Sequence, residues 1–470
     1  MKKISNSKKN FIYNSAYQIL LIIIPLITTP YISRILGAEK IGEYSYSHAI
    51  AYYFVMFIML GLGNYGNRTI AFVRDDKKKL SKTFSEIYKM QLTTAIIATI
   101  IYLIFAIINN NPLTWIMLIY VVSGAIDINW LFFGLEQFKF TVIRSSIIKI
   151  ASTASIFIFV KSKDDLIIYA LINVLAIILS QAALWTRLRK YINPINAPFK
   201  SIKKHIKPNL VLFIPIIAVS LYKIMDKIML GSMSNMEQAG FYESAEKIVQ
   251  VPMALTTSLG TIMMPKISNL VAKKENEKIK KYIYKSIYFA TFTSSLLCFG
   301  IMATAREFVP WYYGDGYDIC ILLFKILMPS CIFLAVANVI RTQYLIPNKE
   351  DKLFIISLSI GAGLNLIINA ILIPKIGAKG AAIGTLIAEA SVFISQVIII
   401  KNKIKVYSVL AESSLFIVAG IIMYILLTII PNLSNNTIIN LTIKSIIGIV
   451  IYISLSLPIY KVFYKTQMQS

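Results

Sequence analysis

Cysteine, histidine and acidic residues are scarce in this chain of 470 residues, which has 3 Cys, 2 His and 22 Asp or Glu. The cysteines lie in or beside apolar stretches and have no metal-type spacing to either histidine, so we expect neither a metal nor a cofactor site. Only 15% of the residues are charged, 57% are hydrophobic and the mean hydropathy is +0.69. These values exclude a soluble globule of this size, which would need more polar surface.

Basic residues are the exception to this scarcity of charge, since 48 Lys or Arg give a formal net charge of +26. A nucleic-acid-binding protein gathers such charge on one exposed face, whereas here it is divided among connectors. The main clusters lie at residues 2–9, 68–82, 187–207 and 273–285, after every second apolar stretch. Cytoplasmic loops of membrane proteins collect Lys and Arg in this way, so we expect no nucleic-acid partner.

Apolar stretches of helix length recur along the whole chain, and a membrane span needs about 20 mostly apolar residues. We predict an all-α polytopic membrane protein with fourteen transmembrane helices, near residues 11–36, 42–66, 85–109, 113–134, 140–161, 165–188, 207–231, 239–267, 282–305, 318–346, 351–373, 379–400, 408–430 and 438–460. The basic connectors then place both termini in the cytoplasm. The first stretch is too long for a signal peptide and is expected to remain as a span.

A repeated pattern divides the chain into two halves. Arg34-Ile-Leu-Gly37 at the end of the first predicted span is echoed by Ile228-Met-Leu-Gly231 at the end of the seventh. Chance recurrence in an Ile-rich chain is the alternative, but the order of several such matches favours two six-helix lobes related by a parallel repeat. The predicted domains are an N-lobe at 1–190, a cytoplasmic linker at 191–206, a C-lobe at 207–405 and two further spans at 406–470.

Charged residues inside the predicted spans are the first candidates for function, because an ion at bilayer depth costs at least about 2.5 to 3.5 kcal/mol. Lys223 and Lys227 are four residues apart and are expected to share one helical face, with Asp226 beside them. The other such residues are Asp127, Lys149, Glu243, Glu246, Lys247, Lys325 and Glu389. Each of them could instead be a structural ion pair or reach out from a helix end, but together they indicate a largely cationic cavity.

Four motifs carry a resemblance to a known family. They are the stretch at 126–139 (IDINWLFFGLEQFK), the stretch at 240–247 (GFYESAEK), Met264-Pro265-Lys266-Ile267 and the stretch at 376–382 (IGAKGAA). In these motifs, and over nearly its whole length, the chain resembles the bacterial polysaccharide repeat-unit flippases. This is the Wzx-type branch of the multidrug/oligosaccharidyl-lipid/polysaccharide exporter superfamily, whose fold is MATE-like. The motifs identify the branch better than the substrate.

The resemblance implies a protein of the bacterial plasma membrane that moves an undecaprenyl-pyrophosphate-linked oligosaccharide from the cytoplasmic to the outer leaflet for surface polysaccharide synthesis. It also implies a proton- or cation-coupled antiporter in contact with membrane lipids, with a polysaccharide polymerase as a candidate partner. The cationic cavity of the family implies substrate-binding roles for Arg34, Lys149, Lys223, Lys227 and Lys247. Coupling roles would fall to Asp127, Asp226, Glu246 and Glu389. Aromatic residues near the outer helix ends, such as Tyr242, could stack on sugars, but interfacial anchoring is the expected role.

Three alternatives stay open at the level of the sequence. A multidrug exporter of the same superfamily would need a cavity dominated by carboxylates, which the lysines of the seventh predicted span disfavour. A flippase for lipid II, the peptidoglycan precursor, shares the carrier and the pyrophosphate and is the nearest alternative. A membrane glycosyltransferase or polymerase should show acidic catalytic residues on a large outer loop, and the outer loops here are short, so we do not expect an enzyme.

Overall fold

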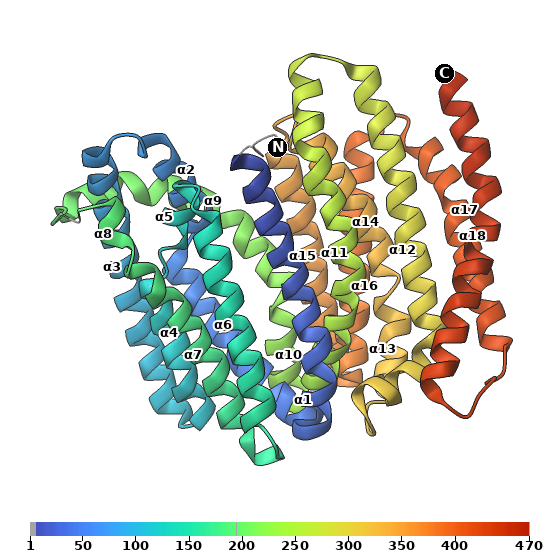
Figure 1. Cartoon of the computed structure of the whole chain (residues 1–470), viewed down its shortest axis with the longest axis horizontal. Coiled ribbons are helices and arrows are strands. Elements are labelled where there is room, and N and C mark those ends of the chain that lie inside the picture. The colour runs from blue at the N-terminus through green and yellow to red at the C-terminus, as the bar shows by residue number, and fades with distance from the viewer. Residues whose placement is uncertain (1–5, 194, 470) are drawn as a thin grey trace, which may run out of the picture. The chain divides into compact units, whose positions relative to one another are not determined.

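The computed structural model describes residues 6–193 and 195–469, with side chains described for 16–193, 195–260 and 263–459. All secondary structure in this part of the chain is helical, and the packing forms two compact units that meet in the sequence at Ser220 and Leu221. The first unit (Figure 1) contains α1 (Asn6–Met59), α2 (Leu62–Val73), α3 (Lys77–Asn109), α4 (Pro112–Ile126), α5 (Asn129–Gly134), α6 (Phe138–Phe159), η1 (Lys163–Asp165), α7 (Leu166–Trp185), α8 (Leu188–Tyr191), η2 (Phe199–Ile202) and most of α9 (Lys203–Lys223). The second contains α10 (Met225–Met233), α11 (Met236–Ala272), α12 (Asn276–Tyr313), α13 (Ile319–Leu327), α14 (Ser330–Ile340), η3 (Arg341–Leu345), α15 (Asp351–Ile376), α16 (Ala378–Ile400), α17 (Val406–Ile429) and α18 (Thr437–Gln469).

Thirteen helical stretches of the described chain are long and apolar enough to cross a membrane. The first, Ala16–Val73, has 58 residues. As one straight helix it would be about 87 Å long, against a hydrocarbon core of about 30 Å. Gly37 interrupts it inside α1 with φ 75° and ψ 171°, a conformation that glycine adopts readily and other residues avoid. Divided there, the stretch supplies two crossings, which brings the total to the fourteen that hydropathy predicts.

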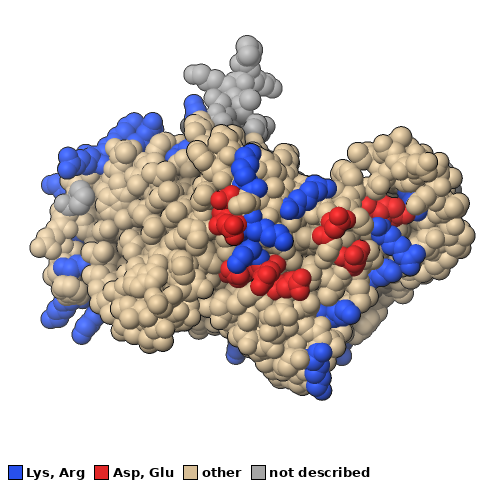
Figure 2. All heavy atoms as spheres, turned by 90° about the horizontal axis from the view of Figure 1, so that it is seen from below, with Lys and Arg blue, Asp and Glu red and all other residues tan. Residues whose placement is uncertain are grey.

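The outer surface of the helices is apolar, as lipid contact requires. Ile104, Ile107 and Ile108 on α3 are among many large hydrophobic side chains that are exposed. Figure 2 views the molecule from below, towards the helix ends, and there some Lys and Arg side chains adjoin acidic ones while others stand apart from them. The chain ends, at residues 1–5 and 470, lie outside the described residues, as does part of the predicted basic cluster at 2–9.

Several predicted spans are broken where the sequence suggested continuous helices. The predicted span 113–134 is interrupted at Asp127, whose backbone is extended (φ −75°, ψ 100°) and whose carboxylate accepts the N–H of Asn129. The predicted span 207–231 is interrupted at Ile224, between α9 and α10. The predicted span 318–346 consists of α13, α14 and the π-helical turn η3. Non-helical backbone at membrane depth is tolerated where protein groups satisfy it, and Asp127 provides such a group itself.

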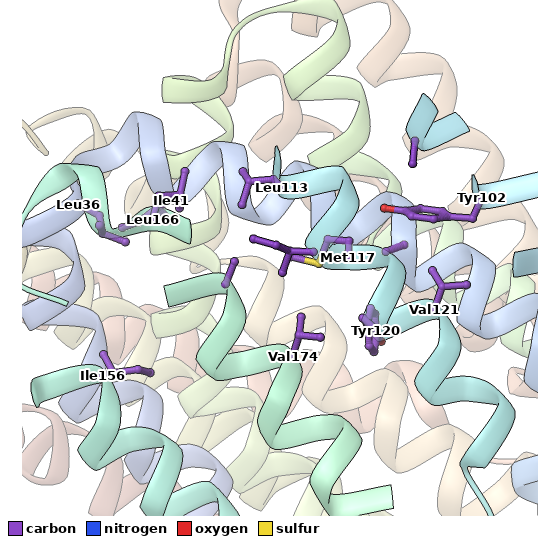
Figure 3. Packing of buried hydrophobic residues seen from close by; sticks show 14 of the residues in the cluster. Leu36, Ile41, Tyr102, Leu113, Met117, Tyr120, Val121, Ile156, Leu166 and Val174 are labelled. Carbon is purple, nitrogen blue, oxygen red and sulfur yellow. The ribbon is translucent and has the colours of Figure 1, made fainter. Parts of the chain in front are cut away.

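The core of the first unit lies among α1, α3, α4 and α7. Leu36, Tyr102, Met117 and Val174 are buried there in one cluster and come from these four helices (Figure 3). In Figure 1, α3, α4 and α7 run side by side in this unit. Membrane helices are held together by close van der Waals packing of this kind, because lipid is as apolar as the helix surfaces and supplies no hydrophobic driving force for their association.

Small residues allow the closest helix contacts of the second unit. Gly377, with φ 58°, forms the turn between α15 and α16, and a Cβ on Gly380 would lie 2.6 Å from the carbonyl carbon of Leu372. These glycines belong to the 376–382 motif, so that motif has a structural role as a tight helical hairpin. The two additional helices α17 and α18 pack on α12, and Tyr452 donates a hydrogen bond to the carbonyl oxygen of Phe292 at 2.8 Å.

The predicted linker lies along the beginning of α3. The backbone N–H groups of Asn193 and Ile195 donate to Ser81 and Ser85 at 3.1 and 3.0 Å. Lys89 Nζ donates to the carbonyl oxygen of Ala197 at 2.6 Å. Hydrogen bonds of its backbone therefore hold the segment against the first unit. Its Pro-rich sequence did not indicate these bonds.

Candidate functional site

Asp226 is the most deeply buried of the predicted site residues, at 1% exposure. Its Oδ2 accepts hydrogen bonds from the hydroxyl groups of Tyr242 and Thr385 at 2.7 and 2.9 Å, and its Oδ1 accepts one from Asn369 Nδ2 at 2.6 Å. All three donors are neutral, and they come from α11, α16 and α15. Hydrogen bonds hold the carboxylate in place, but no ion pair within the described residues offsets its charge.

The surroundings of Asp226 hold further unused hydrogen-bonding capacity. Asn369 Nδ2 also approaches Asn365 Oδ1 at 3.1 Å. Asn369 Oδ1 and Asn365 Nδ2 are buried and have no partner among the described residues. A Cβ on Gly384 would lie 2.0 Å from Asn369 Oδ1, so α16 can approach this site only with a glycine there. The arrangement can accept a proton or a small cation on the carboxylate without leaving another charge unpaired.

Lys227 lies among carboxylates rather than on an open cationic face. Its ammonium group forms ion pairs with Glu243 and with Glu246, the latter at 3.2 Å. Lys247 pairs with Glu243 at 3.3 Å. The helix is interrupted between Lys223 and Lys227, because α9 ends at Lys223 and α10 begins at Met225, so a shared helical face stays a prediction.

Glu389 forms a second charged group in the same unit. Its side chain is 6% exposed, and the positive charges of Lys223 and Arg341 both act on its carboxylate. Lys223 itself is exposed at the end of α9, and Arg341 is half-buried at the start of η3. Lys223 and Glu389 thus lie in the same unit as an arginine that the sequence analysis did not single out.

In the first unit, Asp127 is part of a polar network around the broken helix. Its Oδ1 accepts from the backbone N–H and the Nδ2 of Asn129 at 2.9 and 2.8 Å. Asn129 Nδ2 also donates to Gln181 at 2.9 Å, and Asn129 Oδ1 accepts from Arg144 at 3.2 Å. Gln91 Nε2 donates to the carbonyl oxygen of Asp127 at 2.8 Å. These contacts satisfy backbone groups that the break in the helix leaves unpaired. Asp127 therefore has the structural role that the sequence analysis left open for it.

The two remaining predicted cations lie on packed neighbouring helices of the first unit. Arg34, on α1, is exposed and donates to the carbonyl oxygen of Pro30 at 3.4 Å. Lys149, on α6, is half-buried. The packing of α1 against α6 brings these helices together.

Sequence reasoning missed several residues of these sites. Tyr242 was expected at the membrane interface, but it is 2% exposed and bonded to Asp226, so that expectation is wrong. Asn365 and Asn369 are polar residues four apart in an otherwise apolar helix, and this spacing could have indicated one polar face on α15. Arg341 and Arg144 were also passed over, although each is a charge inside a predicted span.

Comparison with solved structures establishes the fold. The fold matches "Lipid II flippase MurJ, inward closed conformation" with a TM-score of 0.74 and 16% identity, covering 97% of this chain and 100% of that one. It matches an inward-facing multidrug resistance MATE transporter of the MOP superfamily with a TM-score of 0.57 and 12% identity, covering 82% and 98%. At these identities the likeness establishes the fold, which is that of the MurJ and MATE transporters, and the predicted fold class is confirmed.

Sequence comparison identifies the family. The chain belongs to the polysaccharide biosynthesis protein family, whose profile matches residues 7–271. It is 24% identical over 404 residues to an Escherichia coli (strain K12) protein named "Putative O-antigen transporter", covering 84% of this chain and 97% of that protein. The family resemblance drawn from the four motifs is confirmed, and the chain is a multi-pass membrane protein related to transporters rather than to enzymes.

Proposed function

We propose that this protein is a flippase that moves undecaprenyl-pyrophosphate-linked oligosaccharide repeat units from the cytoplasmic to the outer leaflet for surface polysaccharide synthesis. The observation that carries the proposal is the match to the O-antigen transporter protein over 97% of that protein's length. The fold supports it, since it matches that of a structure named "Lipid II flippase MurJ, inward closed conformation".

The cations within the membrane helices support this substrate physically. A pyrophosphate with several sugars cannot cross about 30 Å of hydrocarbon unless fixed charges replace its water and counterions. Lys227 and Lys247 already face carboxylates, so we assign the diphosphate first to Lys223. Arg34 and Lys149, whose helices pack together in the first unit, are proposed as further substrate-binding cations.

The coupling carboxylate of the proposed antiport is Asp226. Three neutral donors orient it, and its charge would be cancelled by a proton or a cation taken up from one side of the membrane. Of the other three candidates, Glu246 is paired with Lys227, Asp127 holds a broken helix and Glu389 faces two cations. Ion binding at Asp226 and substrate binding at the cations can favour opposite conformations, as alternating-access antiport requires.

Flipping by the purified protein in proteoliposomes tests both the proposed substrate and the proposed coupling residue. The measured quantity is the transfer of a polyprenyl-pyrophosphate-linked oligosaccharide between leaflets, under an imposed proton gradient and, separately, a sodium gradient. We expect the parent to respond to one of the gradients and Asp226→Asn to lose that response. Asp315→Asn, a surface substitution of the same kind, serves as the control. A full gradient response in Asp226→Asn would exclude this residue as the coupling site.

The lipid II flippase is the second candidate, because the solved structure with a TM-score of 0.74 is such a protein. The same vesicles distinguish the two when the substrate is changed to a polyprenyl-pyrophosphate-linked peptidoglycan precursor. Transfer of the precursor without transfer of the oligosaccharide would favour the second candidate. A cationic drug as the probe tests the multidrug exporter, which the lysine and arginine charges at membrane depth disfavour.

A further inference from the structure

The linker between α8 and α9 runs along the first turns of α3. The backbone N–H of Asn193 donates to Ser81 at 3.1 Å. Further along the linker, the carbonyl oxygen of Ala197 accepts from Lys89 Nζ at 2.6 Å. Ser81 and Lys89 both lie on α3 and are separated by about 12 Å of helix. The linker therefore follows α3 over about this distance as it leads from α8 to α9.

The depth of Lys89 in the membrane follows from α3 itself. This helix has 33 residues. It is therefore about 50 Å long and exceeds a hydrocarbon core of about 30 Å. Its large exposed apolar side chains begin at Leu92 and continue to Ile108, whereas its exposed first turn, at residues 77–79, is basic. Lys89 precedes Leu92 by about 4.5 Å of helix. It therefore lies in the polar headgroup layer, which is about 5 to 7 Å thick.

Phe199 is held at the level of Lys89 with its ring exposed. The Lys89 ammonium group lies 4.1 Å from the centroid of this ring, within the range of a cation–π contact. The ring is nevertheless 68% exposed, and Ile195 on the same segment is 50% exposed. An exposed apolar ring that is fixed at the headgroup layer has the arrangement of an interfacial anchor.

Positive charge beside this ring is not offset by carboxylates. Lys200 and Lys203 are exposed and have no ion pair within the described part of the chain. The sequence contains no Asp or Glu from residue 166 to residue 225. Glu86 on α3 contacts the start of α9, but Lys204 already pairs with it at 2.7 Å. At the level of the headgroups, anionic phospholipids supply the charge that attracts such basic residues.

We propose that residues 195–203 form a docking surface for anionic phospholipid headgroups, in which Lys200 and Lys203 bind the headgroup and Phe199 is inserted beside it. The inference goes beyond the proposed function, because it concerns the lipids of the membrane and not the transported substrate. It also goes beyond the general enrichment of basic residues in cytoplasmic loops, since contacts with α3 fix this segment at a defined depth. The bilayer surface and α3 then hold the linker from two sides and fix where α9 enters the membrane.

Quenching of a fluorophore on the linker by labelled lipids tests this surface in the full-length protein. Asn196→Cys places the fluorophore on an exposed residue of the segment, and the three native cysteines are buried. The protein is inserted into phosphatidylcholine nanodiscs to which phosphatidylglycerol or phosphatidylcholine with a nitroxide at the top of one acyl chain is added. We expect phosphatidylglycerol to associate about tenfold more tightly than phosphatidylcholine, because two lysines attract it. This preference should fall when the salt concentration is raised.

Matched lysine substitutions locate the charge that is responsible. The double variant Lys200→Gln with Lys203→Gln should lose the preference for phosphatidylglycerol. The double variant Lys401→Gln with Lys403→Gln removes the same charge from exposed residues after α16 and should keep the preference. Equal association of the two lipids with the parent, or an equal loss of preference in both double variants, overturns the proposal. Absence of quenching by either lipid would mean that another occupant covers this surface, and it overturns the proposal as well.

The depth of the segment is tested with single cysteines at its two ends. The fluorophore at Phe199→Cys should be quenched more strongly by the same lipids than the fluorophore at Asn193→Cys, because the linker follows α3 over about 12 Å between these positions. Equal or reversed quenching contradicts the assigned depth.

Removal of the ring separates its apolar contact from the lysine charges. Phe199→Ala in the Asn196→Cys background should weaken quenching by both lipids and leave their ratio unchanged, because the ring contributes no charge. Unchanged quenching by both lipids would refute the insertion of the ring. The substituted side chains are exposed, so thermal unfolding in detergent should be the same in these variants as in the parent.

Discussion

Replacing Lys227 by glutamine tests whether this lysine is structural or binds substrate. Its side chain is 15% exposed and its two partners, Glu243 and Glu246, are 14% and 20% exposed. Removal of the ammonium group leaves Glu243 with Lys247 at 3.3 Å but leaves Glu246 without an ion pair among the described residues. Breaking a buried ion pair in this way destabilises a protein by about 3 kcal/mol or more, which is over a hundredfold in the equilibrium between folded and unfolded protein.

Unfolding of the purified protein in mixed detergent micelles measures this effect. We expect Lys227→Gln to lose stability and the double variant Lys227→Gln with Glu246→Gln to regain part of it, because the unpaired charge is then removed. Lys280→Gln, whose ion pair with Glu277 is at the surface, should change little. If Lys227→Gln unfolds like the parent but abolishes flipping, the structural account is refuted and the role expected from the sequence, substrate binding, is favoured.

Three further results are expected. Cysteines introduced at Lys78 and Asn435 should react with membrane-impermeant thiol reagents from the inside and the outside respectively. The three native cysteines are buried and should not contribute to the labelling. The reverse pattern would refute the proposed topology. Gly384→Ala should lower thermal stability, because its Cβ would lie 2.0 Å from Asn369 Oδ1 at the site of Asp226, and unchanged stability would mean that α16 can move away. Arg144→Gln should lower stability without altering diphosphate affinity in the variant that remains folded, because its donors serve protein acceptors; a selective loss of affinity would contradict this.

The helices themselves could largely be predicted from the sequence. Apolar stretches of helix length have one stable arrangement in lipid, since every backbone group must be satisfied within its own helix. Local signals also mark some ends: Asn111 accepts the N–H of Leu113 at the start of α4, directly before Pro112. The break at Asp127 could not be predicted, because Gln91 on α3, a distant part of the chain, compensates it.

The candidate site was predictable as a set of residues but not as a set of contacts. Glu243 and Lys247 are four apart on one helix, and their ion pair follows from that spacing. Lys223 and Lys227 have the same spacing, yet the helix break separates them and Lys227 turns to two carboxylates on α11. Spacing along a sequence predicts contacts only while the helix continues.

The sequence by itself determined that this chain crosses a membrane about fourteen times, because the thickness of the hydrocarbon core sets the length of each apolar helix. It also determined which charges enter the bilayer. Only the tertiary structure decided what those charges do, because the donors that hold Asp226 come from Asn369 and Thr385, 143 and 159 residues further along the chain. Helices that meet across such separations are brought together by packing, and no local pattern records which of their polar groups will face one another.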